Sequence, residues 1–332
     1  MSNSPKKLII VIPALNEEAT IRQVIQNVPE SIQGISQKTV LVIDDGSKDQ
    51  TVKYAKECGA EVVSHGINRG VGIAFQTGIQ EALKRGADII VHMDGDGQFN
   101  PRDMVKLIEP ILSNGTDITT CTRFSDPKKY PKMPTMKKIG NKMVRFIVNK
   151  ALNKKFTDVS CGYRAYSREA ALKLTLFGKF TYTHEVILDA VTKGLRIKEV
   201  PLEVRGEREV GKSRVASNIL VYGFRWLAIF FRTLRDLSPF QVFGTLATFV
   251  GGIGLISGLF VFFHWLRTGQ TFPYRSLVTL SAVLILLGTF LFTIALLADM
   301  LRRQRMLLEE LLYHARKSSY DQKNNGPDKS DQ

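Results

Sequence analysis

The sequence predicts an α/β protein in which a doubly wound parallel sheet occupies residues 1–215 and membrane-associated helices follow it. Short apolar strands alternate with amphipathic helices through the first part, which is the pattern of parallel strands joined by crossover helices. The last third contains two long apolar runs without a charged residue. A chain of 332 residues with 44% hydrophobic content can form both a buried core and a membrane anchor.

The alternation defines the expected elements in order. The first strand stops at Pro13, and the acidic residues Glu17 and Glu18 are typical of the first turn of a helix. Pro101 likewise suits the first turn of the helix after the fourth strand. The expected strands cover residues 7–13, 39–43, 61–64, 87–93, 116–122 and 195–204. One expected helix starts near residue 16, a second passes through residues 54–56, a third ends near residue 84, and a fourth starts at residue 101. Three more cover residues 135–151, 168–174 and 184–193.

Polar residues follow three of the first four strands. These strand ends are Asn16-Glu17, Asp44-Asp45, and Asp94 with Asp96. In doubly wound sheets, ligands bind outside the carboxyl ends of the strands, near the point where the strand order reverses. The three polar ends therefore predict one binding site at that edge of the sheet.

The strongest chemical signal is the apolar run that ends in Asp94, Asp96 and Gln98 at alternate positions. Carboxylates this close together cannot be buried unpaired, so they need water, a basic partner or a hard divalent cation such as Mg²⁺ or Mn²⁺. Asp-x-Asp is a weak motif by itself and also occurs in plain acidic loops. Its interpretation depends on the rest of the site.

The net charge of +15 indicates an anionic partner, either nucleic acid or a membrane surface. The sequence has no zinc-finger spacing, no RRM-type aromatic signature and no basic helix followed by heptads, so a nucleic-acid binder is disfavoured. The three cysteines, Cys58, Cys121 and Cys161, have no paired spacing and suggest neither a disulfide framework nor a metal site. The amino end does not resemble a signal peptide, and reducing cytosol fits this composition.

Two membrane helices are expected within residues 239–299. Residues 242–263 and 276–298 are each long enough to cross a hydrocarbon core of about 30 Å. Arginines concentrate outside the pair, which by the positive-inside rule predicts a cytoplasmic sheet domain and cytoplasmic termini. Glycines at 251, 254 and 258 suit close helix packing, either within the chain or in a homo-oligomer.

The segments beside these spans have their own composition. Residues 216–238 combine aromatic side chains with arginines, which predicts an amphipathic helix at the membrane interface. Residues 300–332 are expected to form a basic cytoplasmic helix that ends near Arg316, and then a disordered tail from Ser318.

Five sequence blocks together carry a family resemblance. In chain order they are Ile12-Pro13-Ala14-Leu15-Asn16-Glu17, Asp44-Asp45-Gly46-Ser47, Asp94-Gly95-Asp96-Gly97-Gln98, Ser160-Cys161-Gly162-Tyr163-Arg164, and Arg208-x-x-Gly211-x-Ser213-Arg214. Over about residues 6–215 the chain resembles the family-2 glycosyltransferases. It is most similar to their polyprenyl-phosphate branch, which includes dolichyl-phosphate mannose synthases and bactoprenol glucosyltransferases. The resemblance implies a GT-A fold, a nucleotide-sugar donor such as UDP-glucose or GDP-mannose, and a polyprenyl phosphate acceptor of the undecaprenyl or dolichyl type. It also implies inversion at the sugar carbon.

The resemblance also implies roles for individual residues. The metal ligands for Mg²⁺ or Mn²⁺ would be Asp94, Asp96 and Gln98. The catalytic residues would be Asp96, Arg123 and Arg208, and the substrate-binding residues would be Pro13, Leu15, Glu17, Asp45, Gly95, Lys138 and Arg214. Two positions depart from the family pattern, because Cys161 stands where serine is usual and Arg214 where lysine is commoner. Neither departure removes a charge that the reaction needs.

Two other classes of protein share part of this pattern. A processive polysaccharide synthase uses the same donor domain, but such enzymes carry Gln-x-x-Arg-Trp, and here Tyr222 precedes Arg225-Trp226. Two helices also form no polymer channel in one chain. A catalytically silent membrane scaffold would have no reason to keep Asp94 and Asp96 together, because adjacent carboxylates are costly to place.

Overall fold

The computed structural model describes residues 6–113, 115–125, 130–131, 133, 135–176, 182–206 and 239–324. The chain forms two compact units. Met1–Val215 together with Leu311–Gln332 make up the first, here called the sheet unit, and Ala216–Glu310 make up the second, the helical unit. The predicted interfacial helix at 216–238 lies outside the described residues.

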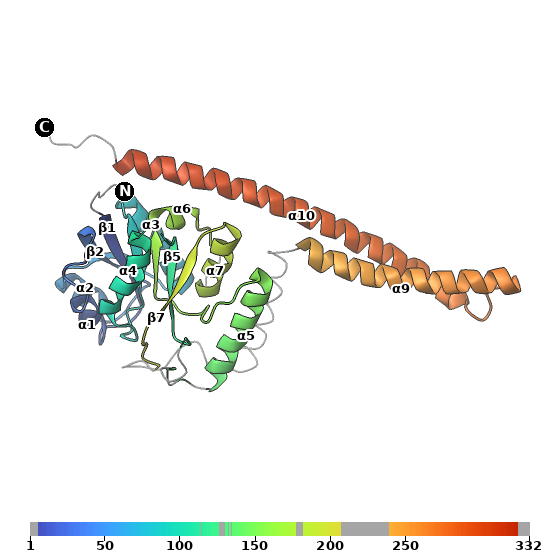
Figure 1. Ribbon diagram of the computed structural model, residues 1–332, viewed down its shortest axis with the longest axis horizontal. Coiled ribbons are helices and arrows are strands. Elements are labelled where there is room, and N and C mark those ends of the chain that lie inside the picture. The colour runs from blue at the N-terminus through green and yellow to red at the C-terminus, as the bar shows by residue number, and fades with distance from the viewer. Residues whose placement is uncertain are drawn as a thin grey trace. The chain divides into compact units, whose positions relative to one another are not determined.

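A seven-stranded mixed sheet forms the centre of the sheet unit (Figure 1). Its strand order is β3-β2-β1-β4-β6-β5-β7. The strands are β1 (Lys6–Ala14), β2 (Ile35–Asp44), β3 (Glu61–Ser64), β4 (Ile89–His92), β5 (Ile118–Thr122), β6 (Arg164–Ser167) and β7 (Ile197–Pro201). The expectation of a purely parallel sheet is wrong at one strand, because β6 runs antiparallel to both β4 and β5.

Helices cover both faces of the sheet, which confirms the doubly wound layering. Successive β1 residues point to opposite faces, so Ile10 packs in one core cluster and Ile9 in the other. The first cluster includes residues of α1 (Ile21–Gln26), α2 (Thr51–Glu57) and α4 (Met104–Leu112). The second includes residues of α3 (Val71–Lys84), α6 (Arg168–Lys173) and α7 (Thr183–Thr192). A short 3₁₀ helix, η1 (Pro101–Asp103), precedes α4, and α5 (Thr135–Leu152) follows β5 in the chain.

The first helix starts later than the acidic residues suggested. It begins at Ile21 rather than near Asn16, because residues 15–20 form turns at the end of β1. Asn16 has a backbone φ of 51°, in the left-handed region that asparagine tolerates better than most residues. These turns leave the backbone after β1 at the carboxyl edge of the sheet.

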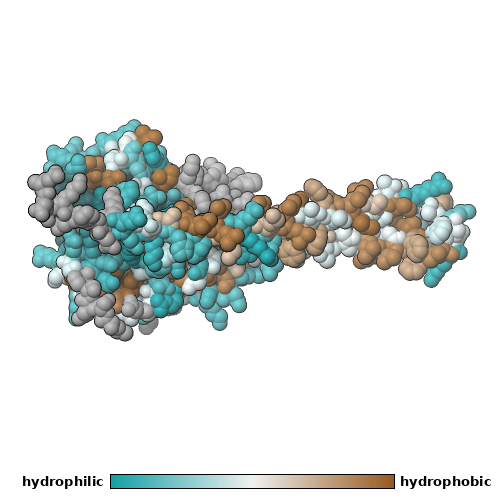
Figure 2. Space-filling model, turned by 90° about the horizontal axis from the view of Figure 1, so that it is seen from above, coloured by the Kyte–Doolittle hydropathy of each residue, from teal (hydrophilic) through white to brown (hydrophobic). Residues whose placement is uncertain are grey.

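Two long apolar helices, α9 (Pro239–Thr268) and α10 (Arg275–Asn324), contain the predicted spans. Both are long and apolar enough to cross a membrane, and Figure 2 shows apolar side chains along them. A side chain on Gly254 would come within 2.8 Å of the Ile285 backbone nitrogen, and one on Gly288 within 2.6 Å of the Gly251 Cα. The glycines therefore serve close packing within one chain. A homo-oligomer through these helices stays a prediction.

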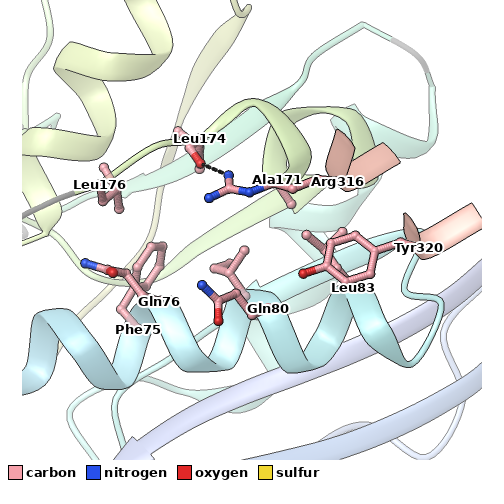
Figure 3. A pocket seen from close by; sticks show the side chains of 10 residues that line it. Phe75, Gln76, Gln80, Leu83, Ala171, Leu174, Leu176, Arg316 and Tyr320 are labelled. Carbon is pink, nitrogen blue, oxygen red and sulfur yellow. Dashed lines mark hydrogen bonds between the residues drawn. The ribbon is translucent and has the colours of Figure 1, made fainter. Parts of the chain in front are cut away.

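The last turns of α10 belong to the sheet unit, where they pack against α3 and α6 (Figure 3). The Tyr313 hydroxyl donates to Glu169 Oε1 at 2.7 Å, and Arg168 pairs with Asp321 at 2.9 Å. Arg316 donates to the Leu174 carbonyl at 2.9 Å, at the end of α6. These contacts explain why the helix continues to Asn324, beyond the tail predicted from Ser318. The recess in Figure 3 has a volume of about 40 Å³ and includes none of the predicted site residues.

Candidate active site

Hydrogen bonds join the loops that follow β1, β2 and β4. The Asn16 N–H donates to the Ser47 hydroxyl at 3.0 Å, and Asn16 Oδ1 accepts from the Lys48 N–H at 2.8 Å. The buried Thr20 hydroxyl donates to the Gly95 carbonyl at 2.7 Å. The three polar strand ends therefore lie together, as the sequence analysis expected.

The predicted nucleotide-pocket residues after β1 lie on this shared edge. Pro13 is buried at the end of the strand, and Leu15 and Glu17 are half-buried just beyond it. The Glu17 N–H donates to the Thr51 hydroxyl at 2.8 Å, at the start of α2. The backbone hydrogen bonds of Asn16 and Glu17 thus hold this turn against the residues that follow β2.

Asp45 organises the loop that leads into α3. Its Oδ1 accepts from the Arg69 N–H and its Oδ2 from the Gly70 N–H, each at 2.9 Å. His65 Nδ1 lies 2.9 Å from Oδ1, and His65 Nε2 lies 3.0 Å from the Thr77 hydroxyl. Asp45 is only 5% exposed, so these donors satisfy a buried carboxylate. Asp45, which the resemblance assigned to nucleotide binding, therefore also holds the loop that precedes α3.

Gly46 allows this loop to pack closely. It has a backbone φ of 85°, and a Cβ there would lie 2.6 Å from the Ile67 carbonyl carbon. Any other residue would be strained in that conformation and would push away the loop that Asp45 holds. The backbone conformation therefore requires glycine at position 46 of the Asp44-Asp45-Gly46-Ser47 block.

The loop after β4 carries the acidic motif. Asp94 is half-buried, whereas Asp96 is 4% exposed and its Oδ1 accepts from the Gln98 N–H at 3.1 Å. Gln98 Nε2 donates to the Arg205 carbonyl at 3.1 Å, and the Arg205 N–H donates back to the Gln98 carbonyl at 3.1 Å. This exchange brings the chain after β7 next to the acidic motif. It also leaves the Gln98 amide oxygen as the atom that could bind a cation.

The donor set of this loop suits a hard cation only with help from a ligand. Among the residues that the structure describes, no three carboxylate, histidine or cysteine side chains gather as a metal cluster. Two carboxylates and one amide oxygen remain, from Asp94, Asp96 and Gln98. Mg²⁺ and Mn²⁺ prefer oxygen ligands, and Mg²⁺ commonly binds to one or two carboxylates together with substrate phosphates and water. The residues therefore fit a cation that a phosphorylated substrate helps to hold.

Arg123, at the end of β5, forms a buried ion pair with Asp158. Arg123 Nε and Nη2 donate to the two Asp158 oxygens at 2.6 and 3.0 Å, and Nη2 also donates to the Ser160 hydroxyl at 2.8 Å. Burial alone would raise the pKa of Asp158, but Arg123 and the hydrogen bonds from Ser160 hold that pKa below its usual range. The Arg123 side chain is therefore fixed in place, and the Asp158 carboxylate balances its positive charge.

A buried polar layer lies beneath the acidic loop. A Cβ on Gly162 would come within 2.7 Å of the Tyr182 hydroxyl and 3.4 Å of Asp94 Oδ2, so only glycine lets these groups approach. His92 Nδ1 lies 3.1 Å from the Gly162 carbonyl and 3.2 Å from the Tyr182 hydroxyl. Burial lowers the pKa of His92 to about 4, so the ring is neutral at physiological pH.

The structure explains why cysteine is tolerated at 161. Cys161 is 1% exposed and packs in the core cluster that also contains Cys121. A hydrogen bond to Cys161 and burial raise the pKa of the Cys121 thiol, so this thiol stays protonated. The side chain at 161 therefore serves packing below the site, and a serine-to-cysteine exchange there changes no exposed group.

The remaining predicted residues divide into two groups. Lys138 is exposed on α5, and Gly95 is buried within the acidic loop, between Asp94 and Asp96. Arg208 and Arg214 lie outside the described residues. Sequence reasoning missed Glu199 on β7, whose carboxylate accepts from the Thr157 and Asp158 N–H groups at 2.9 and 2.8 Å. No sequence signal marked it, because a single glutamate in a half-exposed strand is ordinary.

Comparison with known proteins identifies the family. Residues 9–175 match the model of the family described as Glycosyl transferase family 2. The chain belongs to glycosyl transferase family 2. The transferase is 32% identical over 250 residues to a UDP-N-acetylglucosamine–dolichyl-phosphate N-acetylglucosaminyltransferase of Methanococcus voltae, covering 69% of this chain and 95% of that protein. It is 31% identical to an undecaprenyl-phosphate mannosyltransferase of Micrococcus luteus, covering 64% and 89%.

Solved structures agree on the fold. A glucosyl-3-phosphoglycerate synthase from Mycobacterium tuberculosis, in complex with UDP, aligns with a TM-score of 0.54 at 24% identity, covering 69% of the transferase and 79% of that chain. The same synthase with Mn²⁺, UDP-glucose and phosphoglyceric acid aligns with a TM-score of 0.50 at 26% identity, covering 62% and 73%. The predicted GT-A domain is confirmed, as is the prediction of an enzyme that transfers glycosyl groups.

Proposed function

We propose that the transferase moves one hexose from a nucleotide-sugar to the phosphate of a membrane polyprenol, of the undecaprenyl or dolichyl type. One observation carries the proposal. The names of two relatives specify dolichyl phosphate and undecaprenyl phosphate as acceptors, and the alignments span 95% and 89% of the length of those proteins. The two helices long enough to cross a membrane supply the location that such an acceptor requires.

The donor would bind at the carboxyl edge of the sheet. Pro13, Leu15 and Glu17 would line the base pocket, and the loop ordered by Asp45 would close it. The hydrogen bonds from the Arg69 and Gly70 N–H groups to Asp45 would keep this loop in place around the donor. A structural neighbour that was solved with UDP-glucose supports a UDP-sugar as the donor, while GDP-mannose remains the alternative.

Asp94, Asp96 and Gln98 would hold a Mg²⁺ or Mn²⁺ ion beside the donor diphosphate. When bound, such an ion offsets the negative charge that the leaving nucleoside diphosphate gains. Asp96 and Gln98 are already ordered by the 3.1 Å hydrogen bonds of the loop. Gly95 packs closely against Ile12 and the Pro13 carbonyl, and Gly162 against the Tyr182 hydroxyl and Asp94, so both glycines help to set the position of the acidic loop.

The acceptor would need positioning rather than deprotonation. A phosphate monoester is ionised at neutral pH, so its oxygen can attack the sugar carbon directly. The new carbon–oxygen bond forms as the bond to the diphosphate breaks, with inversion at that carbon. Arg123, held by Asp158, would fix one cation near the phosphates, and Lys138 would add another. Arg208 and Arg214 keep their assigned roles as part of this proposal.

The proposed orientation follows from charge. With the sheet unit and both termini in the cytoplasm, the site would face the compartment that contains nucleotide-sugars, and the arginine-rich flanks of the spans would face anionic lipid headgroups. The expected product of this arrangement is a polyprenyl phosphate that carries the transferred hexose and stays in the lipid phase.

A direct test uses purified full-length protein in detergent with Mg²⁺ or Mn²⁺, a short polyprenyl phosphate, and radiolabelled UDP- and GDP-sugars. Transfer of label to the organic phase from one donor, abolished by EDTA, is expected. Polymer formation without lipid label would instead favour a processive polysaccharide synthase. Nucleotide-sugar hydrolysis without either product would refute the lipid acceptor.

A further inference from the structure

Tyr182 stands directly before α7 and is buried in the polar layer beneath the acidic loop. The residue is 4% exposed. Its ring stacks on the ring of Phe75 in α3, with the ring centres 4.3 Å apart and the planes inclined by 11°. The His92 ring at the end of β4 lies edge-on to it at 5.0 Å. These ring contacts give the Tyr182 hydroxyl a fixed position in the fold.

The Tyr182 hydroxyl and the Asp94 carboxylate approach the same point of the backbone. A Cβ on Gly162 would lie 2.7 Å from the Tyr182 hydroxyl and 3.4 Å from Asp94 Oδ2. Burial, and after it the negative charge of Asp94, raise the pKa of Tyr182 well above its usual range, so the hydroxyl keeps its proton at neutral pH. A buried hydrogen-bond donor therefore lies beside one of the three predicted metal ligands.

His92 links this hydroxyl to the backbone of Gly162. The His92 Nδ1 atom lies 3.1 Å from the Gly162 carbonyl oxygen and 3.2 Å from the Tyr182 hydroxyl. A carbonyl can only accept a hydrogen bond, so Nδ1 carries the proton of the neutral ring and donates it to that oxygen. The Tyr182 oxygen then accepts from the same N–H group. The phenol proton is left for an acceptor on the side of Asp94.

We propose that Tyr182 is a positioning residue for Asp94. Its hydroxyl holds the Asp94 carboxylate against the Gly162 backbone, in the orientation in which that carboxylate would bind a cation. This role rests on the metal site of the proposed function and deepens it, because Tyr182 would act through Asp94 and touch neither the cation nor the sugar. Groups that orient ligating side chains in this way typically contribute 10–100-fold to metal affinity.

Two buried tyrosines separate this role from packing alone. Tyr182→Phe keeps the ring that stacks on Phe75 and removes only the hydroxyl. Tyr166→Phe is the matched control, because Tyr166 is also fully buried and its ring centre lies 5.9 Å from that of Phe75. Its hydroxyl makes no hydrogen bond to any residue that the structure describes. If the tyrosines served packing alone, the two variants would behave alike.

The test measures Mn²⁺ binding without turnover. Electron paramagnetic resonance follows the free Mn²⁺ that remains with full-length protein in detergent and either UDP or GDP, against a blank without protein. Tyr182→Phe is expected to bind Mn²⁺ about tenfold more weakly than wild type, and Tyr166→Phe with unchanged affinity. Without Mn²⁺, both variants should melt within about 4 °C of wild type, because each loses at most one neutral hydrogen bond.

A double-variant cycle tests whether Tyr182 acts through Asp94. Asp94→Asn should weaken Mn²⁺ binding, and adding Tyr182→Phe to it should weaken binding no further, because the carboxylate that the hydroxyl orients is already gone. In the lipid-transfer assay, the Mn²⁺ concentration that gives half the maximal rate should rise about tenfold in Tyr182→Phe. Saturating Mn²⁺ should restore the rate, since Asp94 itself is intact.

The outcomes distinguish this inference from the proposed function. Equal Mn²⁺ affinity of wild type and Tyr182→Phe would overturn the role of Tyr182, as would equal losses in Tyr182→Phe and Tyr166→Phe or additive losses in the double variant. No Mn²⁺ binding by wild type with either nucleotide would reject the proposed metal site together with this role. Weaker binding by Tyr182→Phe without lipid transfer from any donor would support the role of Tyr182 and reject the proposed acceptor.

Discussion

Replacing Asp158 with asparagine should destabilise the transferase strongly, because the substitution leaves Arg123 without its counter-charge. The Asp158 side chain is fully buried and that of Arg123 is 16% exposed, so water can solvate the orphaned guanidinium only in part. Removing one partner of a buried ion pair typically costs about 3–5 kcal/mol. In a unit of this size, each kcal/mol lowers the melting midpoint by about 2–4 °C, which predicts a fall of roughly 6–20 °C.

Two controls isolate the cause. Arg22 and Glu57 form a similar pair on the surface, with side chains 43% and 41% exposed, so Glu57→Gln should cost about 1 kcal/mol or less. Combining Arg123→Met with Asp158→Asn removes both charges and should melt at a higher temperature than Asp158→Asn alone, because no unpaired buried charge remains.

The assay is thermal unfolding of full-length protein in one detergent, followed by intrinsic fluorescence. A midpoint for Asp158→Asn within about 2 °C of wild type would refute the reasoning, because it would correspond to a loss near 1 kcal/mol. Equal midpoints for Asp158→Asn and the double variant would likewise show that the unpaired guanidinium is not the source of the instability.

Three further predictions test other parts of the molecule. Asp96→Ala should reduce label transfer at least about 100-fold while the protein still fractionates with membranes, and unchanged turnover would reject the metal assignment. Burial lowers the pKa of His184 to about 4, so the unfolded chain binds a proton at this residue before the folded chain does as the pH falls. The contribution of His184 to the free energy of unfolding should therefore be complete above pH 6.5 and fall by about 3 kcal/mol toward pH 4. In melting curves measured across this range, His184→Gln should reduce the dependence of the midpoint on pH. Gly254→Ala should lower the melting midpoint because its Cβ would lie 2.8 Å from the Ile285 nitrogen, whereas Gly252→Ala, with nothing within 4 Å, should be neutral or stabilising. Equal effects of the two alanines would contradict the helix packing.

Periodicity predicted most of the fold because most elements carry a clear apolar pattern. The carboxyl halves of β1 and β2 and the whole of β4 are apolar and lead into proline or aspartate, whereas the polar first half of β2, from Ile35, was missed. Residues 242–263 and 276–298 of the two long apolar helices contain no charged residue. β6 escaped prediction because its four residues begin with Arg164, which is fully buried on pairing with β4 and β5. A charged residue inside a sheet is decided by tertiary contacts, and no local pattern announces it.

The site was predictable to the extent that its residues are neighbours in sequence. Asp94, Asp96 and Gln98 stand out because they follow one strand at alternate positions. The Asp158 partner of Arg123 lies 35 residues away in the sequence, and the partners of the Asp45 side chain lie 20 to 25 residues away, so only the folded chain identifies them. Long-range partners depend on strand order, and β6, a strand that was not predicted, lies between β4 and β5.

Asp45 and Asp94 follow strands of the same sheet and look alike in the sequence, yet the fold places their carboxylates in different surroundings. Asp45 is buried, and its carboxylate accepts hydrogen bonds from two backbone N–H groups. Asp94 is half-buried and shares its loop with Asp96, so two negative charges lie close together. Under the proposed function, a cation bound there would offset the charge of these carboxylates and of a diphosphate beside them. A carboxylate that holds the loop before α3 and a carboxylate pair that would hold a cation are thus separate requirements, and the transferase places them after β2 and β4, the two strands on either side of β1.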